Sequence, residues 1–434
     1  MAINSLSHYK LLIKMLPLAM LYHNNANAEI SYDFSGFGTL GYAVSNNPSP
    51  YLQYIDNEGT FSRDSLIAGQ LDIRFSPKLS ATIQAKLAAN NSQANGVDVD
   101  ITWAFLSYRP TNDWLFRIGE LQVPGYLNSV NRDVGVTYDY ARLPAEADST
   151  SPIYHFTGAA ISKTFNFDDS DFTIDLYAGK KTTDLRYYIG NEIPGAYTQG
   201  SSYNQVKINL AGLAFSYKTP KHTFVAAIHR VKVKNEGGEE WLKEIGFKET
   251  IPGSDIGYYN NFPSSGASVT NRFDLYIANI GANISLGNDL RLASELVYRK
   301  TNDLNIGING VLGYVSLQKR IDKWTPYIFY SQIKTFSNDL KKHQRIDSNQ
   351  VPSATLYAGL INASQHVIAD IYQAYDQFSV AIGTSYRFSP VSVLKAEIMF
   401  VEVDQTSSLF DVSSQNESSD FSTTIFSLSY SFAF

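Results

Sequence analysis

The last strand of the chain carries the pattern that most constrains the fold. Its alternate positions form a wholly apolar set, and the positions between them hold small side chains. The first set is Phe426, Leu428, Tyr430, Phe432 and Phe434, and the second is Ser427, Ser429, Ser431 and Ala433. Because successive side chains of a β-strand point to opposite faces, the segment has one apolar face and one small, mostly polar face. A soluble sandwich could use such a strand, but a strand between lipid and water requires one, which favours a membrane-spanning β-barrel.

The same alternation recurs along the chain and predicts an all-β fold, a transmembrane antiparallel β-barrel of about sixteen strands. The predicted strands are 30–42, 66–75, 79–87, 97–105, 114–121, 156–165, 171–179, 206–218, 222–233, 270–285, 290–300, 309–320, 323–335, 374–388, 391–402 and 421–434. Tight turns such as Ser76-Pro77-Lys78 alternate with long connections such as 234–269 and 336–373. Short turns at one end and long loops at the other are typical of outer-membrane barrels, with both termini on the periplasmic side. Eight strands are filled by side chains, whereas sixteen leave an aqueous channel.

The N-terminal residues have the layout of a secretory signal peptide. Lys10 and Lys14 accompany a short apolar stretch, and a small-residue site of the A-x-A kind ends at Ala28. The alternative, a membrane anchor, is disfavoured because the stretch is shorter than the ~20 residues that a helix needs to span a bilayer. We therefore expect a signal peptide over 1–28 and a barrel over 29–434.

Composition excludes several functions. The chain has no cysteine, which rules out disulfides and thiolate chemistry, and its 29 tyrosines and 25 phenylalanines can supply aromatic girdles. Without the two lysines of 1–28, the chain has 33 basic and 41 acidic side chains, a net charge of −8. Nucleic-acid binding favours a basic surface instead, so we expect no nucleic-acid partner.

Two regions resemble the proteobacterial trimeric porin family. They are the terminal aromatic strand and residues 117–144, which include the long segment after the fifth predicted strand. In that family the loop between strands five and six folds into the lumen and narrows it. The resemblance implies a homotrimer in the outer membrane, in contact with lipid and lipopolysaccharide, that passes small hydrophilic solutes by passive diffusion. It also implies that Tyr430, Phe432 and Phe434 form the assembly signal read by the barrel assembly machinery.

The loop, near 123–155, supplies the charged residues expected at a pore constriction. They are Arg132, Asp133, Asp139, Arg142, Glu146 and Asp148. Strand alternation points three basic residues of the nearby wall inward: Arg74, Lys86 and Arg117. Family porins set a basic wall against an acidic loop, which implies a transverse field here. Since four acids and two bases lie in the loop, we expect weak cation selectivity. The alternative, a solvated surface loop, is disfavoured by the position of the segment in the strand order.

Other motifs carry less weight. The segment Gly36-Phe37-Gly38-Thr39-Leu40-Gly41 matches a dinucleotide-binding pattern, but it lies inside a predicted strand with no helix after it. Asp98 and Asp100 form an inward pair without a matching histidine in sequence, and we interpret them as part of the lumen wall. The acidic turn of Asp168, Asp169 and Asp171 could bind a cation, but a solvated turn is the simpler interpretation.

The sequence thus predicts no enzyme and no catalytic, cofactor or metal site, since no HExxH or G-x-S-x-G motif occurs. Other functions stay open. One is a substrate-specific channel for a sugar, phosphate or peptide, in which Tyr138 and Tyr140 would belong to an aromatic slide. Another is an outer-membrane barrel enzyme. A transporter with a plug domain is disfavoured because strands begin directly after residue 28.

Overall fold

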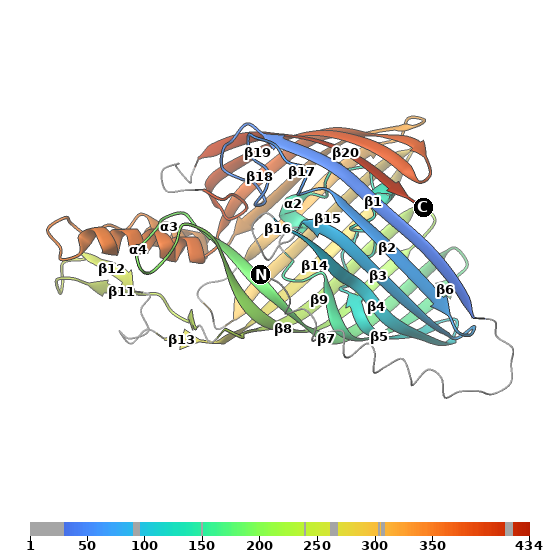
Figure 1. Cartoon of the computed structure of the whole chain (residues 1–434), viewed down its shortest axis with the longest axis horizontal. Coiled ribbons are helices and arrows are strands. Elements are labelled where there is room, and N and C mark those ends of the chain that lie inside the picture. Colours follow the sequence, from blue (N-terminus) through green and yellow to red (C-terminus); the bar gives the residue numbers. More distant parts are fainter. Residues whose placement is uncertain are drawn as a thin grey trace.

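The computed structural model describes residues 30–89, 96–148, 151–237, 240–260, 268–302, 304, 309–412 and 420–434. Within these residues, sixteen antiparallel strands form a closed barrel in which each strand bonds to its neighbours in the chain (Figure 1). The strands are β1 Ser31–Ser45, β2 Leu66–Arg74, β3 Leu79–Ala89, β4 Val97–Thr111, β5 Trp114–Gln122, β6 His155–Phe167, β7 Ser170–Ile189, β8 Gly200–Lys218, β9 His222–Asn235, β14 Arg272–Gly287, β15 Leu290–Asn302, β16 Gly310–Lys319, β17 Trp324–Thr335, β18 Tyr375–Ser389, β19 Ser392–Ser407 and β20 Phe421–Ala433. The predicted fold and strand order are confirmed. Residues 1–28, the predicted signal peptide, lie outside the described residues.

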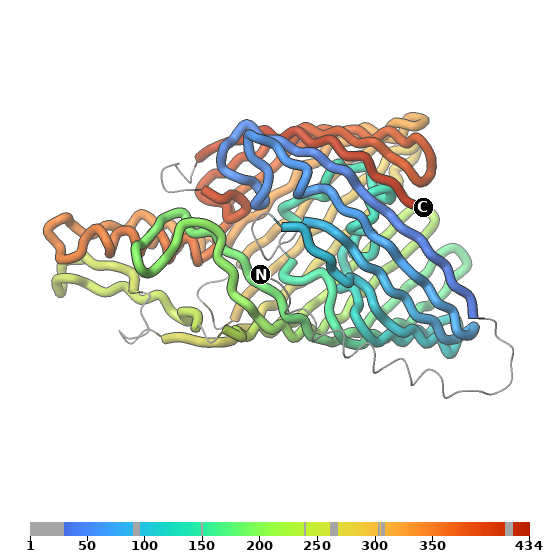
Figure 2. Tube along the Cα trace, viewed as in Figure 1, coloured from blue at the N-terminus to red at the C-terminus, as the bar shows by residue number. Residues whose placement is uncertain are grey.

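The barrel closes where the first strand meets the last. In Figure 2 the blue trace of β1 runs beside the red trace of β20, and the register pairs Gly38 with Phe432. Gly36 and Phe434 exchange two backbone hydrogen bonds of 2.9 Å. A Cβ on Gly36 would lie 2.4 Å from the Phe434 ring, and one on Gly38 would lie 2.7 Å from the Phe432 ring. Gly36 and Gly38, the first two glycines of the dinucleotide-like segment, therefore give the terminal aromatic rings room at the seam.

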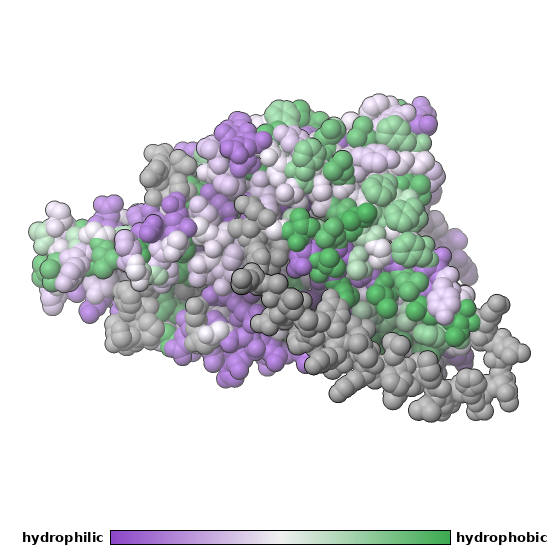
Figure 3. Space-filling model, in the orientation of Figure 1, coloured by the Kyte–Doolittle hydropathy of each residue, from purple (hydrophilic) through white to green (hydrophobic). Residues whose placement is uncertain are grey.

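The two faces of each barrel strand differ as the sequence pattern predicts. On β17 the exposure alternates. Ile328 and Tyr330 are exposed, whereas Tyr327, Phe329 and Ser331, at the alternate positions, are buried. We call the first side the outer face and the second the lumen face. On β20 the exposed outer-face side chains include Phe426, Leu428 and Tyr430. Figure 3 shows apolar side chains gathered on the outer surface of the barrel, away from the end that carries α3 and α4. Such a surface suits contact with lipid hydrocarbon.

The connections alternate in length, as predicted. Long connections at one end contain two short hairpins and two helices, which lie apart from the C-terminus in Figure 1. The hairpins pair β10 Trp241–Leu242 with β13 Val269–Thr270, and β11 Gly246–Glu249 with β12 Gly257–Asn260. The helices are α3 Ser337–Asp347 and α4 Ala358–Ile371, which pack through Leu340, Ile346 and Ile368. Among the described residues, no helix is long and apolar enough to cross a membrane.

Some strands are longer than the pattern predicted. β7 runs to Ile189 instead of residue 179, and its partner β8 begins at Gly200 instead of residue 206. The first five residues of the added part read Lys180-Lys181-Thr182-Thr183-Asp184, which is polar on both faces. Without lipid on one side there is no apolar face to maintain, so the alternation that identifies a strand disappears although its backbone pairing continues.

Candidate functional site

The connection between β5 and β6, residues 123–154, packs against the lumen face of the barrel. We call it the inner loop. It contains a 3₁₀ turn, η3 Gly135–Thr137, and one short helix, α2 Ala145–Asp148. Near its start, the Asn279 side chain donates a 2.6 Å hydrogen bond to the Gly125 carbonyl, and the Leu127 amide donates to Glu295. Further along, the loop contacts side chains of β16 to β20 that face away from the exposed apolar side chains. The loop therefore lies inside the barrel.

An aromatic group fixes the middle of the inner loop. Tyr140 is 3% exposed and meets the rings of Tyr314, Tyr327 and Phe329 edge-on, at centroid distances of 6.4, 5.3 and 5.9 Å. Gln318 donates a hydrogen bond to the Tyr140 hydroxyl. The Ala141 amide donates to the Tyr327 hydroxyl at 3.0 Å. Edge-to-face pairs of this kind stabilise packing beyond the area they bury, so Tyr140 anchors the loop to the wall and is not free to line a passage.

A buried carboxylate fixes the end of the loop. Glu146 on α2 is 0% exposed. Its oxygens accept hydrogen bonds from Ser331 at 2.6 Å, from Gln377 at 2.7 Å and from Ser379. These donors come from two adjacent strands, β17 and β18. A buried carboxylate is tolerated only when its oxygens are bonded, and here neutral donors satisfy it.

The other charged residues of the loop are drawn into ion pairs. Arg132 contacts Asp148 through two nitrogens, at 2.8 and 2.6 Å. Arg142 makes a similar two-pronged contact with Asp64 of the connection between β1 and β2. Asp133 lies 2.8 Å from the Lys86 ammonium on β3.

Asp139 forms the last pair. It accepts a 2.6 Å hydrogen bond from Ser385 and lies 3.5 Å from an Arg387 nitrogen. The six loop residues selected from sequence are therefore brought to the inside of the barrel, but five of them are paired and the sixth is buried. Sequence reasoning missed their partners Asp64 and Arg387. Asp64 lies in a loop without periodic pattern, so no local signal marks it.

The ion pairs keep their groups charged. Burial alone would raise the pKa of Asp133, but the Lys86 ammonium and the Arg132 guanidinium outweigh burial and hold the pKa below its ordinary value. Burial would lower the pKa of Arg142, whereas the Asp64 carboxylate raises it above the ordinary value. Both groups therefore stay ionised across the physiological pH range, so the pairs are permanent features of the lumen.

Only one of the three predicted wall residues contacts the inner loop. Lys86 pairs with Asp133, as described. Arg117 instead donates to Ser162 and lies 3.5 Å from Asp175, both on the neighbouring wall. Arg74 is exposed at the end of β2, in register with Ser80. The alternation of one strand indicates which face a side chain occupies, but it does not tell where along the barrel axis the loop crosses, so a role of Arg74 and Arg117 at the constriction stays a prediction.

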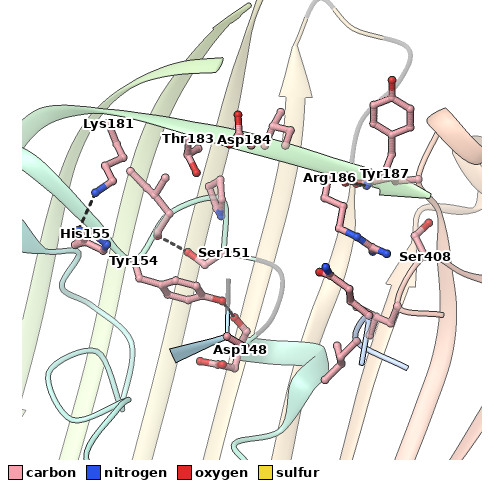
Figure 4. Close-up of a pocket in the computed structure, with 18 of the residues that line it drawn as sticks. Asp148, Ser151, Tyr154, His155, Lys181, Thr183, Asp184, Arg186, Tyr187 and Ser408 are labelled. Atoms are coloured by element: carbon pink, nitrogen blue, oxygen red, sulfur yellow. Dashed lines mark hydrogen bonds between the residues drawn. The ribbon is translucent and has the colours of Figure 1, made fainter. Parts of the chain in front are cut away.

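A cavity of about 1150 Å³ lies beside the inner loop. Side chains of both signs line it, among them Lys86, Asp98, Asp100, Asp133, Arg142 and Lys181. Tyr138 also lines it, and the Lys395 ammonium lies 3.9 Å from the centre of its ring. Figure 4 shows part of this lining, with Lys181 of β7 pointing toward His155 and with Tyr154 and Asp148 of the loop below that strand. The lining combines charged and hydroxyl-bearing side chains with apolar ones such as Leu143, Ile153 and Phe273, and its charged part can hold water and small charged or hydroxylated solutes.

Solved structures with the same architecture support this description. A loop-deleted form of OmpT, an outer membrane protein of Vibrio cholerae, aligns with a TM-score of 0.52 and 12% identity, over 93% of this chain and 99% of that one. The in-vitro folded trimer form of OmpT aligns with a TM-score of 0.51 and 11% identity, over the same shares. An anion-selective porin from Comamonas acidovorans aligns with a TM-score of 0.50 and 12% identity, over 94% of this chain and 100% of that one. No protein-family model matches the chain, and no curated protein matches it in sequence.

The chain has the fold of outer-membrane porins. Together with the apolar outer surface, this fold places the protein in a bacterial outer membrane, because closed barrels with such a surface satisfy every backbone group in lipid. At these identities the likeness concerns the fold alone, so the solute and the roles of individual residues are argued from this chain's own side chains.

The lumen also contains a histidine that the sequence did not single out. His155, the first residue of β6, contacts Asp100 and Glu120, so Asp100 has the histidine neighbour that its sequence context lacked. The link joins residues 55 positions apart, which no local motif reveals. Among the described residues, no group of three or more His, Asp or Glu side chains has the arrangement of a metal site. The acidic turn of Asp168, Asp169 and Asp171 is exposed.

Proposed function

We propose that the protein is a passive diffusion channel of the outer membrane that passes small hydrophilic solutes. The observation that carries the proposal is the cavity of about 1150 Å³, lined in part by charged side chains, inside a closed sixteen-stranded barrel. A barrel of this strand number is wide enough to hold a water-filled passage. A solute that keeps its hydration can cross such a passage down its gradient without a chemical step.

In this proposal the inner loop forms the constriction. Arg132, Asp133, Asp139, Arg142, Glu146 and Asp148 contribute its charges, and Lys86 contributes the facing wall, with Arg74 and Arg117 farther along. The pairing of these charges supports a small net selectivity, because opposite charges a few ångströms apart largely cancel at the scale of a hydrated ion. We expect a weak preference for cations, since the loop holds four acids against two bases.

The packing of Tyr140 excludes its ring from an aromatic slide of a substrate-specific channel, although Tyr138 lines the cavity. An aromatic slide needs ring faces along the passage, whereas this ring is enclosed by Tyr314, Tyr327 and Phe329. An enzymatic role is also disfavoured. Both nitrogens of His155 contact carboxylates, so its imidazole has no nitrogen left to activate a serine or threonine hydroxyl.

The proposal extends to assembly and partners. One OmpT structure is of a trimer form, and we propose a homotrimer here as well. We propose that residues 1–28 are removed as a signal peptide, that lipid and lipopolysaccharide cover the outer face, and that the barrel assembly machinery reads Tyr430, Phe432 and Phe434. Cross-linking in mild detergent would reveal three-chain species, and N-terminal sequencing of the membrane protein would begin at residue 29.

The deciding experiment is conductance in a planar bilayer. We expect stepwise increases in current whose size grows in proportion to salt concentration, and liposome swelling with neutral sugars that slows as the sugar becomes larger. A conductance that one class of solute blocks at low concentration would instead indicate a substrate-specific channel. A correctly folded protein that conducts no ions would contradict the proposal.

A further inference from the structure

Four charged side chains from four adjacent strands meet at the edge of the cavity. The imidazole of His155 on β6 lies between two carboxylates: its Nε2 is 2.8 Å from Asp100 on β4, and its Nδ1 is 2.5 Å from Glu120 on β5. The Lys181 ammonium on β7 is 2.9 Å from Glu120 and 3.1 Å from the same Nδ1 (Figure 4). We call these residues the histidine cluster.

Both protonation states of the ring have hydrogen-bond partners in this arrangement. The charged imidazolium donates from Nε2 to Asp100 and from Nδ1 to Glu120. A neutral ring protonated on Nε2 still donates to Asp100, and its bare Nδ1 can accept from the Lys181 ammonium. Because neither state leaves a buried polar atom without a partner, the geometry permits the ring to gain and lose a proton, as histidine ordinarily does between pH 5 and 8.

The charges around the ring come close to balance. Two further charged groups lie near the cluster, Lys86 on β3 and its ion-pair partner Asp133 on the inner loop. Both are close enough for their charges to act on it. With His155 charged, the three cations of this neighbourhood match its three carboxylates. With His155 neutral, the neighbourhood carries one net negative charge. Asp98, on the same strand as Asp100, also lines the cavity and adds a further carboxylate to this neighbourhood.

We propose that His155 determines the ion selectivity of the channel, with its neutral form favouring cations. This inference rests on the proposed function, since it needs a conducting pore. His155 lines the cavity together with four of its charged neighbours, Lys86, Asp100, Asp133 and Lys181. A charge at this edge acts over the Debye length, ~10 Å at 0.1 M salt, which is comparable to the width of such a passage. We therefore expect the cation-to-anion permeability ratio to rise about twofold as the ring loses its proton.

The test is the reversal potential across a salt gradient, measured from pH 5 to pH 8. The wild-type channel should shift toward cation preference as the pH rises. His155→Gln should lose most of that shift and show at pH 5 the selectivity that the wild type has at pH 8. His366→Gln is the matched control, because His366 also contacts a carboxylate, Asp347, but lies on α4 outside the barrel. It should keep the wild-type shift.

A second variant keeps the test decisive if His155→Gln does not assemble. Glu120→Gln removes one of the two negative charges that stabilise the charged ring while Asp100 keeps the other, so the midpoint of the shift should move to lower pH. A wild-type channel whose selectivity is the same at pH 5 and pH 8 would overturn the inference, as would a His155→Gln channel with the full shift. Either result leaves the diffusion channel standing, whereas absence of conductance in the wild type refutes the proposed function itself.

Discussion

Replacing Glu146 by alanine should release the end of the inner loop from the wall. The substitution removes both carboxylate oxygens and leaves three buried donors without their acceptor. These donors belong to Ser331, Gln377 and Ser379, which are 0%, 1% and 0% exposed. Since the donors cannot reach bulk water while the loop stays docked, the docked state loses stability relative to a state in which the loop has moved away.

The magnitude follows from the number of bonds. A hydrogen bond to a charged group contributes about 1.5–3 kcal/mol, and an unsatisfied buried donor costs about 1–3 kcal/mol. Three neighbouring bonds are not additive, and water from the channel can replace part of the lost acceptor. We therefore expect docking to weaken by about 3 kcal/mol, which raises the undocked population about 100-fold.

Two measurements detect the undocked loop. Single-channel records of Glu146→Ala should show larger conductance or frequent transitions to a larger level, because the loop no longer narrows the passage. Limited proteolysis should cut within the inner loop faster than in the wild type. Glu146→Gln should be milder, since an amide oxygen can still accept, and Glu192→Ala on an exposed connection should have no effect. If Glu146→Ala matches the wild type in both conductance and proteolysis, the carboxylate does not anchor the loop and the reasoning is refuted.

Three further outcomes are expected. Deleting Phe434 should lower the amount of folded, heat-modifiable barrel in outer membranes, because the terminal ring completes the seam with β1; wild-type amounts would refute this role. The double variant Asp133→Asn with Asp139→Asn should shift the reversal potential toward anions, because each change leaves a cation unpaired; an unchanged potential would place the loop outside the constriction. Burial raises the pKa of Asp370 on α4 to about 7, so the folded helix holds a proton that the unfolded segment releases near pH 4. The contribution of this group to helix docking is therefore full below about pH 4 and is lost as the pH rises through 7. Because amide exchange is itself base-catalysed, the readout is the protection of α4 relative to the intrinsic exchange rate at the same pH. That protection should be lower at pH 8 than at pH 5, and Asp370→Asn should remove most of the difference.

The barrel was predictable from sequence because lipid imposes a pattern on each strand. Wherever one face meets hydrocarbon, apolar side chains recur at every second position, and all sixteen barrel strands were found by that rule. The rule failed where lipid ends, as in β7 beyond residue 179. It also gave no account of α3 and α4, whose sequence lies inside a long connection and follows the helical period over only a few turns.

The candidate site was predictable only in part, for a different reason. Position in strand order selected the inner loop, and its charged residues could be read directly. Their partners could not, because ion pairs such as Arg142 with Asp64 join segments 78 residues apart. Alternation fixes which face of a strand a side chain occupies, but the height at which a loop crosses the barrel depends on tertiary packing. Lys86 therefore meets the loop and Arg74 does not.

One feature of the sequence does explain which wall the inner loop occupies. The lumen face of β17, β18 and β20 is rich in serine, and six of these serines are buried against the loop or its immediate contacts: Ser331, Ser379, Ser385, Ser427, Ser429 and Ser431. A Cβ on Gly135 would lie 2.2 Å from the Ser431 hydroxyl, so the backbone approaches this wall as closely as small side chains permit. The opposite wall, β3 to β7, carries long charged side chains, including Lys86, Glu120 and Lys181, and the loop reaches it through the ion pair of Asp133 with Lys86. The small side chains of the last strand thus contact the inner loop, and the aromatic residues between them face outward. The cavity lies along the charged wall, where the histidine cluster is.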